Sequence, residues 1–315
     1  MKIAKLALAA VALTTTAAVA PGVAVAQEAT ASVAAGATVY GNDGAEIGTI
    51  EAVQGDTVIL ESTSPVGTTE AMRDAIAAAR PDLELPGLGE GQPDVSIAYC
   101  PERVLPGKIL EELTHNDRSI GGITPRCARK ALAFYKRFVK GECVTTDARS
   151  AEMTKLVENA FRDVNIAFAN ELSMIADKQG LDVWEVIRMA NRHPRVNILT
   201  PGPGVGGHCI AVDPWFIVDS APDDTDLIRA ARKVNDAKPH HLAGRIVEHA
   251  RDLKDPVIAC LGLAYKADID DLRESPAITV VRELAGADVG EILAVASSQF
   301  FHLLEATFEL AVRCT

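Results

Sequence analysis

The spacing of apolar and polar residues changes several times along the 315-residue chain. Residues 6–20 are nearly all apolar, and residues 38–60 form short alternating runs separated by Gly, Asn and Asp. From residue 57 onward, short apolar runs typical of strands alternate with longer amphipathic stretches typical of helices. The pattern predicts an apolar leader, a small β-meander and a layered α/β protein, in that order.

Residues 1–26 have the form of an export signal. Lys2 and Lys5 precede the apolar run, and Ala24-Val25-Ala26 has the small-x-small form of a cleavage site. The run is too short, and too interrupted by threonines, for a stable membrane span. The alternative interpretation is a misplaced start or a gene fusion that puts foreign sequence ahead of a cytosolic enzyme.

Residues 27–56 are predicted to form a small β-meander. This stretch contains no Lys or Arg, and its apolar runs at 38–40, 47–53 and 57–60 are separated by Asn42-Asp43-Gly44 and Gln54-Gly55-Asp56. Gly, Asn and Asp supply the positive φ that tight turns need. The stretch holds no His or Cys, so we assign it no chemistry.

The α/β alternation over 57–148 predicts a mostly parallel, layered sheet. Strands are expected at 57–61, 95–99, 118–120 and 143–146, and helices at 69–80 and 124–140. Thr124 and Pro125 suit the N-cap and first positions of the second helix. This half-domain would be followed by a central helical domain.

The central helical domain is expected at 149–250, beginning with a long helix at 150–179 and a second helix at 183–191. A further α/β domain starts at 255–295, with a strand at 257–265, a helix at 276–284 and a strand at 291–295. The tail, 296–315, is unrelated to it. Its apolar stretch at 299–312 predicts an amphipathic helix that covers the exposed sheet.

Composition narrows the class of protein. The chain has 31 Lys and Arg against 43 Asp and Glu, a net charge of −12, 48% hydrophobic residues and 23% charged residues. These values are typical of a globular protein, and the acidic balance disfavours nucleic acid as a partner. Six cysteines are too few for a disulfide scaffold, and no spacing indicates a metal site.

Two segments carry candidate chemistry. Lys155 and Asn159 lie four residues apart, and therefore on one face of the long helix. The glycine-rich run at 200–207 leads to Cys209, with Asp213 four residues later. A cysteine presented on such a loop is a candidate nucleophile. The alternatives are a solvated lysine and a flexible turn with a buried cysteine; no strand precedes the run, which argues against a dinucleotide fingerprint.

Five motifs in order, over about 57–295, resemble the UDP-glucose/GDP-mannose dehydrogenase family. They are Glu61-Ser-Thr-Ser-Pro-Val-Gly-Thr-Thr69, Tyr99-Cys-Pro-Glu-Arg103, Lys155-Leu-Val-Glu-Asn159, the run ending in Cys209 with Asp213-Pro214, and Leu261-Gly-Leu-Ala-Tyr-Lys266 with Asp270-Asp-Leu-Arg-Glu-Ser-Pro276. Within the family, their form is most similar to members that act on UDP-N-acetyl-D-mannosamine.

The resemblance implies oxidation of a UDP-sugar C6 alcohol to the uronic acid, with NAD as cofactor. Cys209 would form a thiohemiacetal and then a thioester. Lys155 and Asn159 would stabilise the oxyanion, whereas Asp213 and Thr63 would hold water or move protons. Glu102 would act in the hydrolytic step.

The resemblance also implies binding roles and an assembly. The substrate-binding residues would be Lys266, Arg195, Gly206 and Gly207, and the cofactor would be contacted by Arg273, Thr63 and Glu102. A solvated loop charge is the alternative for Arg195. The family pairs subunits through the long central helix, which implies a homodimer.

The chain departs from the family pattern at both ends of the match. Family members begin with a strand, a GxGxxG turn and a helix that cradle the pyrophosphate, and this sequence has no such unit. The match is expected to stop near Asp56 and Val295, which implies incomplete Rossmann-like parallel sheets flanking the central helical domain. Two hypotheses stay open: a dehydrogenase, or an inactive truncated or fused remnant with a partial nucleotide-sugar pocket. The chemistry implies the cytoplasm, whereas the leader implies export.

Overall fold

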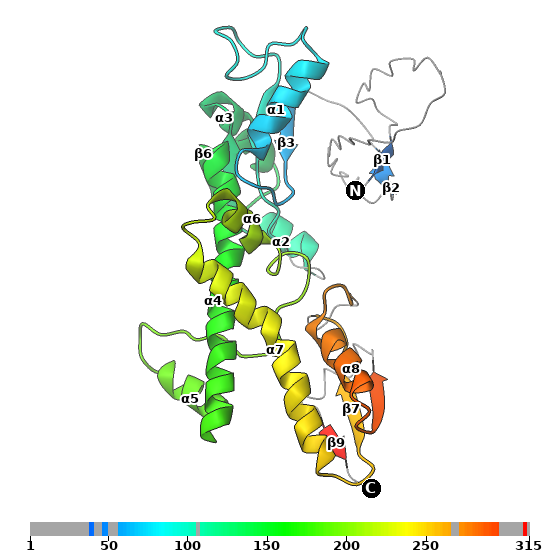
Figure 1. Ribbon diagram of the computed structural model, residues 1–315. Helices are drawn as coiled ribbons and strands as arrows, with labels where there is room; N and C mark the ends of the chain where they lie inside the picture. Colours follow the sequence, from blue (N-terminus) through cyan, green and yellow to red (C-terminus); the bar gives the residue numbers. More distant parts are fainter. Residues whose placement is uncertain are drawn as a thin grey trace, which may run out of the picture. The chain divides into compact units, whose positions relative to one another are not determined.

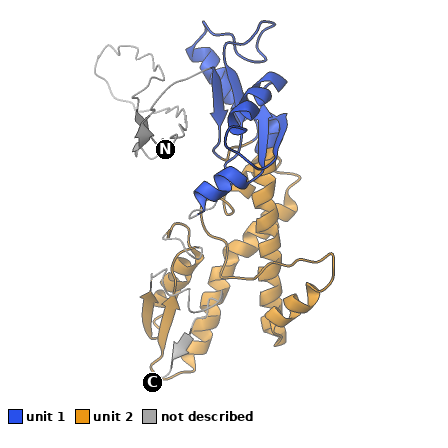
Figure 2. Ribbon diagram, turned by 180° about the vertical axis from the view of Figure 1, so that it is seen from behind, with its two compact units in different colours: residues 1–62, 66–152 blue, residues 63–65, 153–315 orange. Residues whose placement is uncertain are grey.

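The computed structural model describes residues 38–40, 46–49, 56–104, 108–265, 271–295 and 311–313. The chain divides into two compact units, shown in Figure 2. Unit 1 comprises residues 1–62 and 66–152, and unit 2 comprises residues 63–65 and 153–315. The predicted leader, 1–26, lies outside the described residues.

Unit 1 contains a four-stranded mixed sheet. Its strands are β3 (Thr57–Leu60), β4 (Ser96–Tyr99), β5 (Arg118–Gly122) and β6 (Cys143–Asp147), in the order β3-β4-β5-β6. The pairs β3–β4 and β5–β6 are parallel, as predicted. The β4–β5 pair is antiparallel, so the sheet is mostly but not entirely parallel, in agreement with the mostly parallel sheet expected. The connection from β4 to β5 includes α2 (Ile109–His115). It starts β5 at the same end of the sheet where β4 finishes, and not at the opposite end.

Two helices pack with this sheet, α1 (Thr68–Ala79) and α3 (Pro125–Tyr135). Thr124 caps α3 through its side chain, and Pro125 opens the helix, as the sequence predicts. The helix ends at Tyr135 and not at residue 140, because the chain continues as tight turns in which Arg137 and Phe138 bond the carbonyls three residues back. The core between α3 and the sheet contains Ala98, Cys100, Ile120, Ala131, Tyr135 and Val139.

Unit 2 is built on long helices, seen as green and yellow ribbons in Figure 1. They are α4 (Ala148–Gln179), whose first residues belong to unit 1, and α7 (Asp226–Arg251). The shorter helices are α5 (Val183–Ala190) and α6 (Asp213–Ser220). Trp215 lies in the first turn of α6 with 41% of its surface exposed. The predicted helices at 150–179 and 183–191 are confirmed.

A small sheet completes unit 2. It contains β7 (Val257–Leu261), β8 (Glu291–Val295) and β9 (Ala311–Arg313) in the order β8-β7-β9, and α8 (Pro276–Gly286) lies between β7 and β8 in the chain. The β7–β8 pair is parallel and the β7–β9 pair antiparallel. Ala311 and Val312 are therefore strand residues, and the prediction of a helix is wrong there. The rest of the predicted helix, 299–310, lies outside the described residues.

Within the described residues, the segment predicted as a meander contains one pair of strands. Strands β1 (Thr38–Tyr40) and β2 (Glu46–Thr49) pair antiparallel. The third expected strand, β3, pairs with β4 instead, because both belong to the sheet of unit 1. Among the helices that the structure describes, none is both long and apolar enough to cross a membrane.

Candidate active site

The glycine-rich run is a loop that leads into α6. It follows α5 and the irregular residues 191–199, so no strand precedes it, as predicted. Gly202, Gly204 and Gly207 have the formal GxGxxG spacing, but the loop lacks the strand that the dinucleotide fold requires. Gly204 and Gly207 have φ values of +140° and +80°, which side chains rarely adopt.

Tyr265, at the end of the segment after β7, lies directly on the two glycines before His208. A Cβ atom on Gly207 would lie 2.6 Å from Cε2 of the Tyr265 ring. A Cβ atom on Gly206 would lie 2.5 Å from the carbonyl oxygen of Glu274. The two glycines are thus required by close packing against the segment that precedes α8.

Asp213 is the centre of a buried group of side chains. It is 2% exposed, and its Oδ2 accepts a hydrogen bond of 2.5 Å from Nδ2 of Asn159, which is 7% exposed. Burial raises the pKa of the Asp213 carboxyl, although Asn159 and the charges of Lys155 and His208 act in the opposite direction. Unit 2 therefore brings Lys155, Asn159 and Asp213 together, and a carboxyl with a raised pKa suits proton transfer.

Cys209 lies one turn before α6 and is exposed. Its Sγ is 3.8 Å from Nδ1 of His208. Its carbonyl oxygen accepts the backbone N–H groups of Val212 and Asp213, at 3.0 and 2.8 Å. These bonds fix the backbone of Cys209 relative to the buried Asp213. A thiol beside an imidazole and a helix N-terminus has the surroundings of a reactive cysteine.

Arg273 and Asp271 form an ion pair near the same loop, with 2.7 Å between Nη2 and Oδ2. Hydrogen bonds from the Arg273 side chain and backbone lower the pKa of Asp271 to about 2. Burial first, then the charges of Asp271 and Cys209, raise the pKa of the Tyr265 phenol, while Arg273 opposes the shift. Tyr265, Asp271 and His208 are members of the site for which the sequence analysis assigned no role.

The remaining predicted residues lie in several parts of the chain. Lys266 lies outside the described residues. Arg195 is exposed after α5, and its backbone N–H donates to His193 Nδ1 at 3.3 Å. Thr63 is half-buried and belongs to unit 2. Glu102 belongs to unit 1, where its backbone N–H donates to the carbonyl of Glu61 at 3.1 Å.

In unit 1, the N-terminus of α1 is occupied by the side chain of Glu152. This carboxylate is fully buried and accepts the backbone N–H groups of Gly67 and Thr69, at 2.6 and 2.7 Å, and the Thr69 hydroxyl at 2.6 Å. Glu152 thus takes the donors that a phosphate would use at a helix N-terminus.

We expect Glu152→Ala to lower the free energy of unfolding by about 2–3 kcal/mol, because it leaves buried amide donors without an acceptor. Urea unfolding followed by circular dichroism measures the change. The matched control is Glu171→Ala, an exposed glutamate on the same helix, which should stay within about 0.5 kcal/mol of the parent. Equal stability of the two variants would contradict the capping role.

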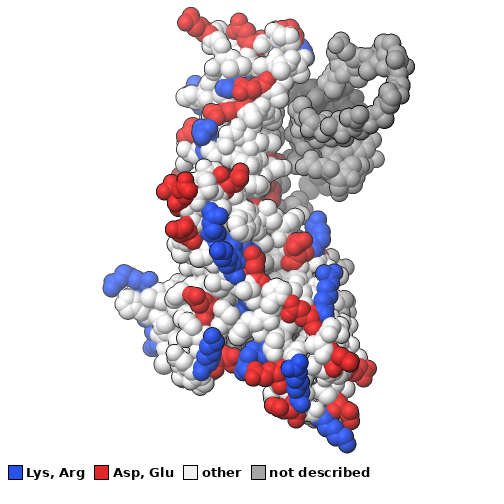
Figure 3. Space-filling view, in the orientation of Figure 1, with Lys and Arg blue, Asp and Glu red and all other residues white. Residues whose placement is uncertain are grey.

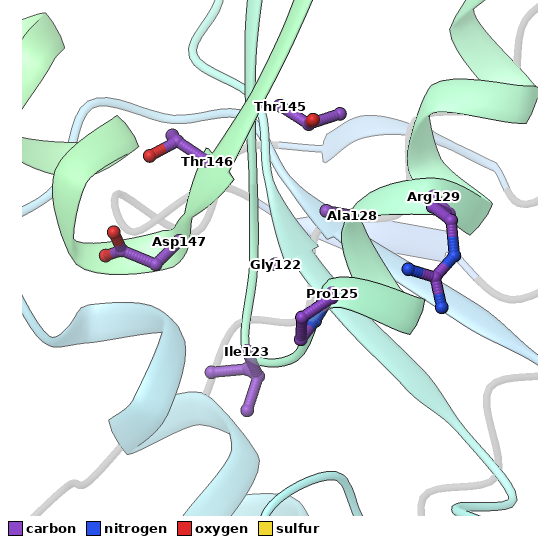
Figure 4. A pocket seen from close by; sticks show the side chains of 8 residues that line it. All are labelled: Gly122, Ile123, Pro125, Ala128, Arg129, Thr145, Thr146 and Asp147. Atoms are coloured by element: carbon purple, nitrogen blue, oxygen red, sulfur yellow. The ribbon is translucent and has the colours of Figure 1, made fainter.

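Other described surfaces show no competing site. A hollow in unit 1 lies between α3 and the ends of β5 and β6, and no predicted site residue lines it (Figure 4). Its lining residues are Gly122, Ile123, Pro125, Ala128, Arg129, Thr145, Thr146 and Asp147. On the face drawn in Figure 3, acidic and basic side chains are interspersed. Within the described ranges, no group of three His, Cys, Asp or Glu residues is placed to hold a metal ion.

Three family models match the chain in order. They describe the UDP-glucose/GDP-mannose dehydrogenase family: its NAD binding domain at residues 44–139, its central domain at 149–237 and its UDP binding domain at 259–293. The matches confirm the resemblance inferred from the motifs. The first match begins at residue 44, upstream of the seam expected near Asp56.

Curated relatives are similar over 77% of this chain. An NDP-N-acetyl-D-galactosaminuronic acid dehydrogenase from Ralstonia nicotianae is 62% identical over 242 residues, and a UDP-N-acetyl-D-mannosamine dehydrogenase from Yersinia pestis is 60% identical over 250 residues. The chain spans only 57% and 60% of their respective lengths. A solved UDP-D-ManNAc dehydrogenase from Pyrococcus horikoshii is 43% identical, with a TM-score of 0.67, and the match covers 78% of this chain and 56% of that one.

Proposed function

Because the chain belongs to the UDP-glucose/GDP-mannose dehydrogenase family, we propose that it serves the NAD-dependent oxidation of UDP-N-acetyl-D-mannosamine to UDP-N-acetyl-D-mannosaminuronate. The observation that carries the proposal is the group formed by Asn159, Asp213 and Lys155 next to the loop of Cys209. The names of the relatives support an N-acetylated amino sugar as the substrate, and the two relatives differ in whether that sugar is of the galactosamine or the mannosamine type.

The proposed chemistry converts a primary alcohol to a carboxylate in two oxidations. At the aldehyde level, the Cys209 thiolate adds to the carbonyl carbon and forms a thiohemiacetal; loss of hydride leaves a thioester, which water cleaves to the acid and the free thiol. Lys155 and Asn159 stabilise the oxyanion, and Asp213 exchanges protons with water in the site. NAD supplies the hydride acceptor for both oxidations.

Residues outside this group complete the proposal. In this proposal, Thr63 and Glu102 act on the hydrolytic water and contact the cofactor, which Arg273 also contacts. The UDP-sugar is bound by Lys266, Arg195, Gly206 and Gly207. The proposed domains are 57–148 for NAD, 149–250 for the central helices and 255–295 for the start of the UDP-sugar domain. Residues 27–56 and 296–315 lie outside these three domains.

The direct test incubates purified protein with NAD and UDP-N-acetyl-D-mannosamine and follows NADH at 340 nm. The proposal expects two NADH per molecule of uronic acid. The corresponding N-acetylgalactosamine nucleotide tests the choice of sugar. Formation of one NADH and a free aldehyde would contradict the thioester route.

The alternative proposal is a remnant that binds nucleotide-sugar but does not turn it over. The specific observation in its favour is the buried carboxylate of Glu152, which takes the backbone donors at the N-terminus of α1. Calorimetric titration with UDP-sugar and separately with NAD distinguishes the two. Binding of UDP-sugar without binding of NAD would favour the remnant.

We also propose that the chain forms a homodimer through α4. Five exposed apolar residues follow one another at helical spacing along this helix: Met153, Val157, Phe161, Phe168 and Ile175, with exposed fractions of 37%, 50%, 66%, 51% and 45%. Intervals of four and seven residues place them on one face. A contiguous apolar stripe of this kind is typical of an interface between subunits.

We expect Phe161→Glu to convert the dimer to a monomer, because a buried charge without a partner is costly in an interface. Light scattering coupled to size-exclusion chromatography measures the mass. Leu227→Glu is the matched control, since Leu227 is 68% exposed on α7 and outside the stripe. A monomeric parent, or a dimer that survives the Phe161 substitution, would contradict this interface.

For the compartment, we propose the cytoplasm, where NAD and UDP-sugars are found and where a free thiol stays reduced. The export signal read in residues 1–26 is the competing proposal. Mass spectrometry of the protein from its host decides between them, because a chain that starts at Gln27 means that the leader was removed.

A further inference from the structure

A continuous set of side-chain hydrogen bonds connects α4 and α7 to the base of the glycine-rich loop. Oδ1 of Asp163 accepts from Arg232 Nη1 at 2.6 Å and from Asn235 Nδ2 at 2.8 Å. Oδ1 of Asn235 accepts from Asn170 Nδ2 at 2.9 Å, and Oδ1 of Asn170 accepts from the backbone N–H of Gly202 at 2.8 Å. We call Asp163, Asn235 and Asn170 the amide relay; none of the three is more than 1% exposed.

The relay has only one possible direction. An ionised carboxylate accepts but does not donate, so Asn235 must turn its NH₂ group to Asp163 and its oxygen to Asn170. Asn170 must then turn its own NH₂ group to Asn235 and its oxygen outward. The carbonyl oxygen of Asp163, which accepts from Asn235 Nδ2 at 3.0 Å, and the carboxylate paired with Arg232 therefore decide that an acceptor, and not a donor, faces the loop.

The loop has little freedom where it meets the relay. A Cβ atom on Gly204 would lie 3.2 Å from the carbonyl oxygen of Asn235 and 3.2 Å from Cδ of Pro239. Pro201, next to Gly202, is buried. The backbone of the loop thus rests on α7 while its N–H group is held by α4.

We propose that Asn170 and Asn235 are positioning residues, which set the place of the 202–209 loop and thereby the place of Cys209. The inference rests on the proposed role of Cys209 as nucleophile, but the hydrogen bonds that define the relay do not depend on turnover. Six residues lie between Gly202 and Cys209, and Tyr265 packs against this stretch at Gly206 and Gly207. The relay fixes its beginning and α6 fixes its end.

The first test uses Asn170→Leu, which keeps the approximate size of the side chain but removes both of its hydrogen bonds, to Asn235 and to the backbone N–H of Gly202. Hydrogen exchange measured by mass spectrometry should become about tenfold faster in the peptide that contains Gly202, since one net hydrogen bond is worth about that factor. The matched control is Asn165→Leu on the same helix, because Asn165 bonds only the carbonyl of Phe161. Exchange in that variant should match the parent.

The second readout is the pH dependence of Cys209 labelling, which a merely structural role of Asn170 would leave unchanged. Iodoacetamide labels Cys209, and its rate between pH 6 and 10 is followed by mass spectrometry of the peptide. In Asn170→Leu the profile should move to higher pH, because the thiol loses its fixed place beside His208 and the N-terminus of α6. Labelling of Cys143, in unit 1, is the internal control and should not change.

An Asn170→Leu variant that folds, and that matches the parent in both exchange and the Cys209 profile, overturns the proposal. If this variant does not fold, Asn170→Ser and Asn235→Ser provide the same comparison. Fast exchange of the Gly202 amide in the parent protein would overturn the proposal without any variant. Absence of NADH formation would count against the proposed function, but it would leave these measurements unaffected.

Discussion

Replacement of Cys209 by alanine is expected to abolish formation of the uronic acid, with a loss of roughly a thousandfold or more in turnover, because Cys209 is the proposed carrier of the covalent intermediate. The first oxidation of the alcohol does not involve the thiol. The variant should therefore release the aldehyde, or hold it in the site, instead of forming the acid. Product analysis by mass spectrometry and the ratio of NADH to acid measure this difference.

Cys143→Ala provides the matched control for that experiment. Cys143 is a half-buried cysteine on β6 in unit 1, outside the proposed site. Its replacement should leave the ratio of NADH to acid unchanged. Acid formation by Cys209→Ala at the parent's rate would mean that another nucleophile, or water alone, performs the second oxidation.

Asp163→Ala is expected to lower the free energy of unfolding by about 3–5 kcal/mol. The substitution leaves the guanidinium of Arg232, which is 2% exposed, without its buried partner. It also removes the carboxylate acceptor of Asn235 Nδ2, which keeps only the carbonyl oxygen of Asp163 at 3.0 Å. Urea unfolding followed by circular dichroism measures the loss.

Asp236→Ala is the matched control, because Asp236 bonds the same arginine but is 56% exposed. Water replaces that contact, so the expected loss is below about 1 kcal/mol. The double substitution Asp163→Leu with Arg232→Leu removes both buried charges and should recover part of the stability. Equal losses for the two aspartates would show that burial does not decide the value of this ion pair.

Local signals in the sequence predicted the elements but not the direction of every strand. The pair Thr124-Pro125 marks the start of α3, and the structure places the N-cap there. The antiparallel direction of β5 was missed, because a short connection and a crossover both leave the same pattern of apolar residues in the strand. Strand β9 was missed for a related reason. Ala311 and Val312 fit a helix or a strand, and their pairing with β7 makes them a strand.

The candidate site, too, could be predicted only in part from the sequence. Spacing alone placed Lys155 and Asn159 on one helix face, and the motif resemblance assigned Asp213 to the same proposed site. The structure adds a hydrogen bond from Asn159 to Asp213. The amide relay joins residues that are 65 and 72 positions apart, so no local spacing reveals it. The contact of Tyr265 with Gly207 likewise depends on the packing of two distant segments.

The place of Trp215 provides an optical signal for the site. The chain has two tryptophans, and Trp215 lies two residues after Asp213 in the first turn of α6. Because it is 41% exposed, its emission responds to a change of solvent around that turn. Trp184 lies on α5, so a Trp184→Phe chain leaves Trp215 as the single emitter. Intrinsic fluorescence of such a chain would follow occupancy next to Asp213 in real time, with no added label.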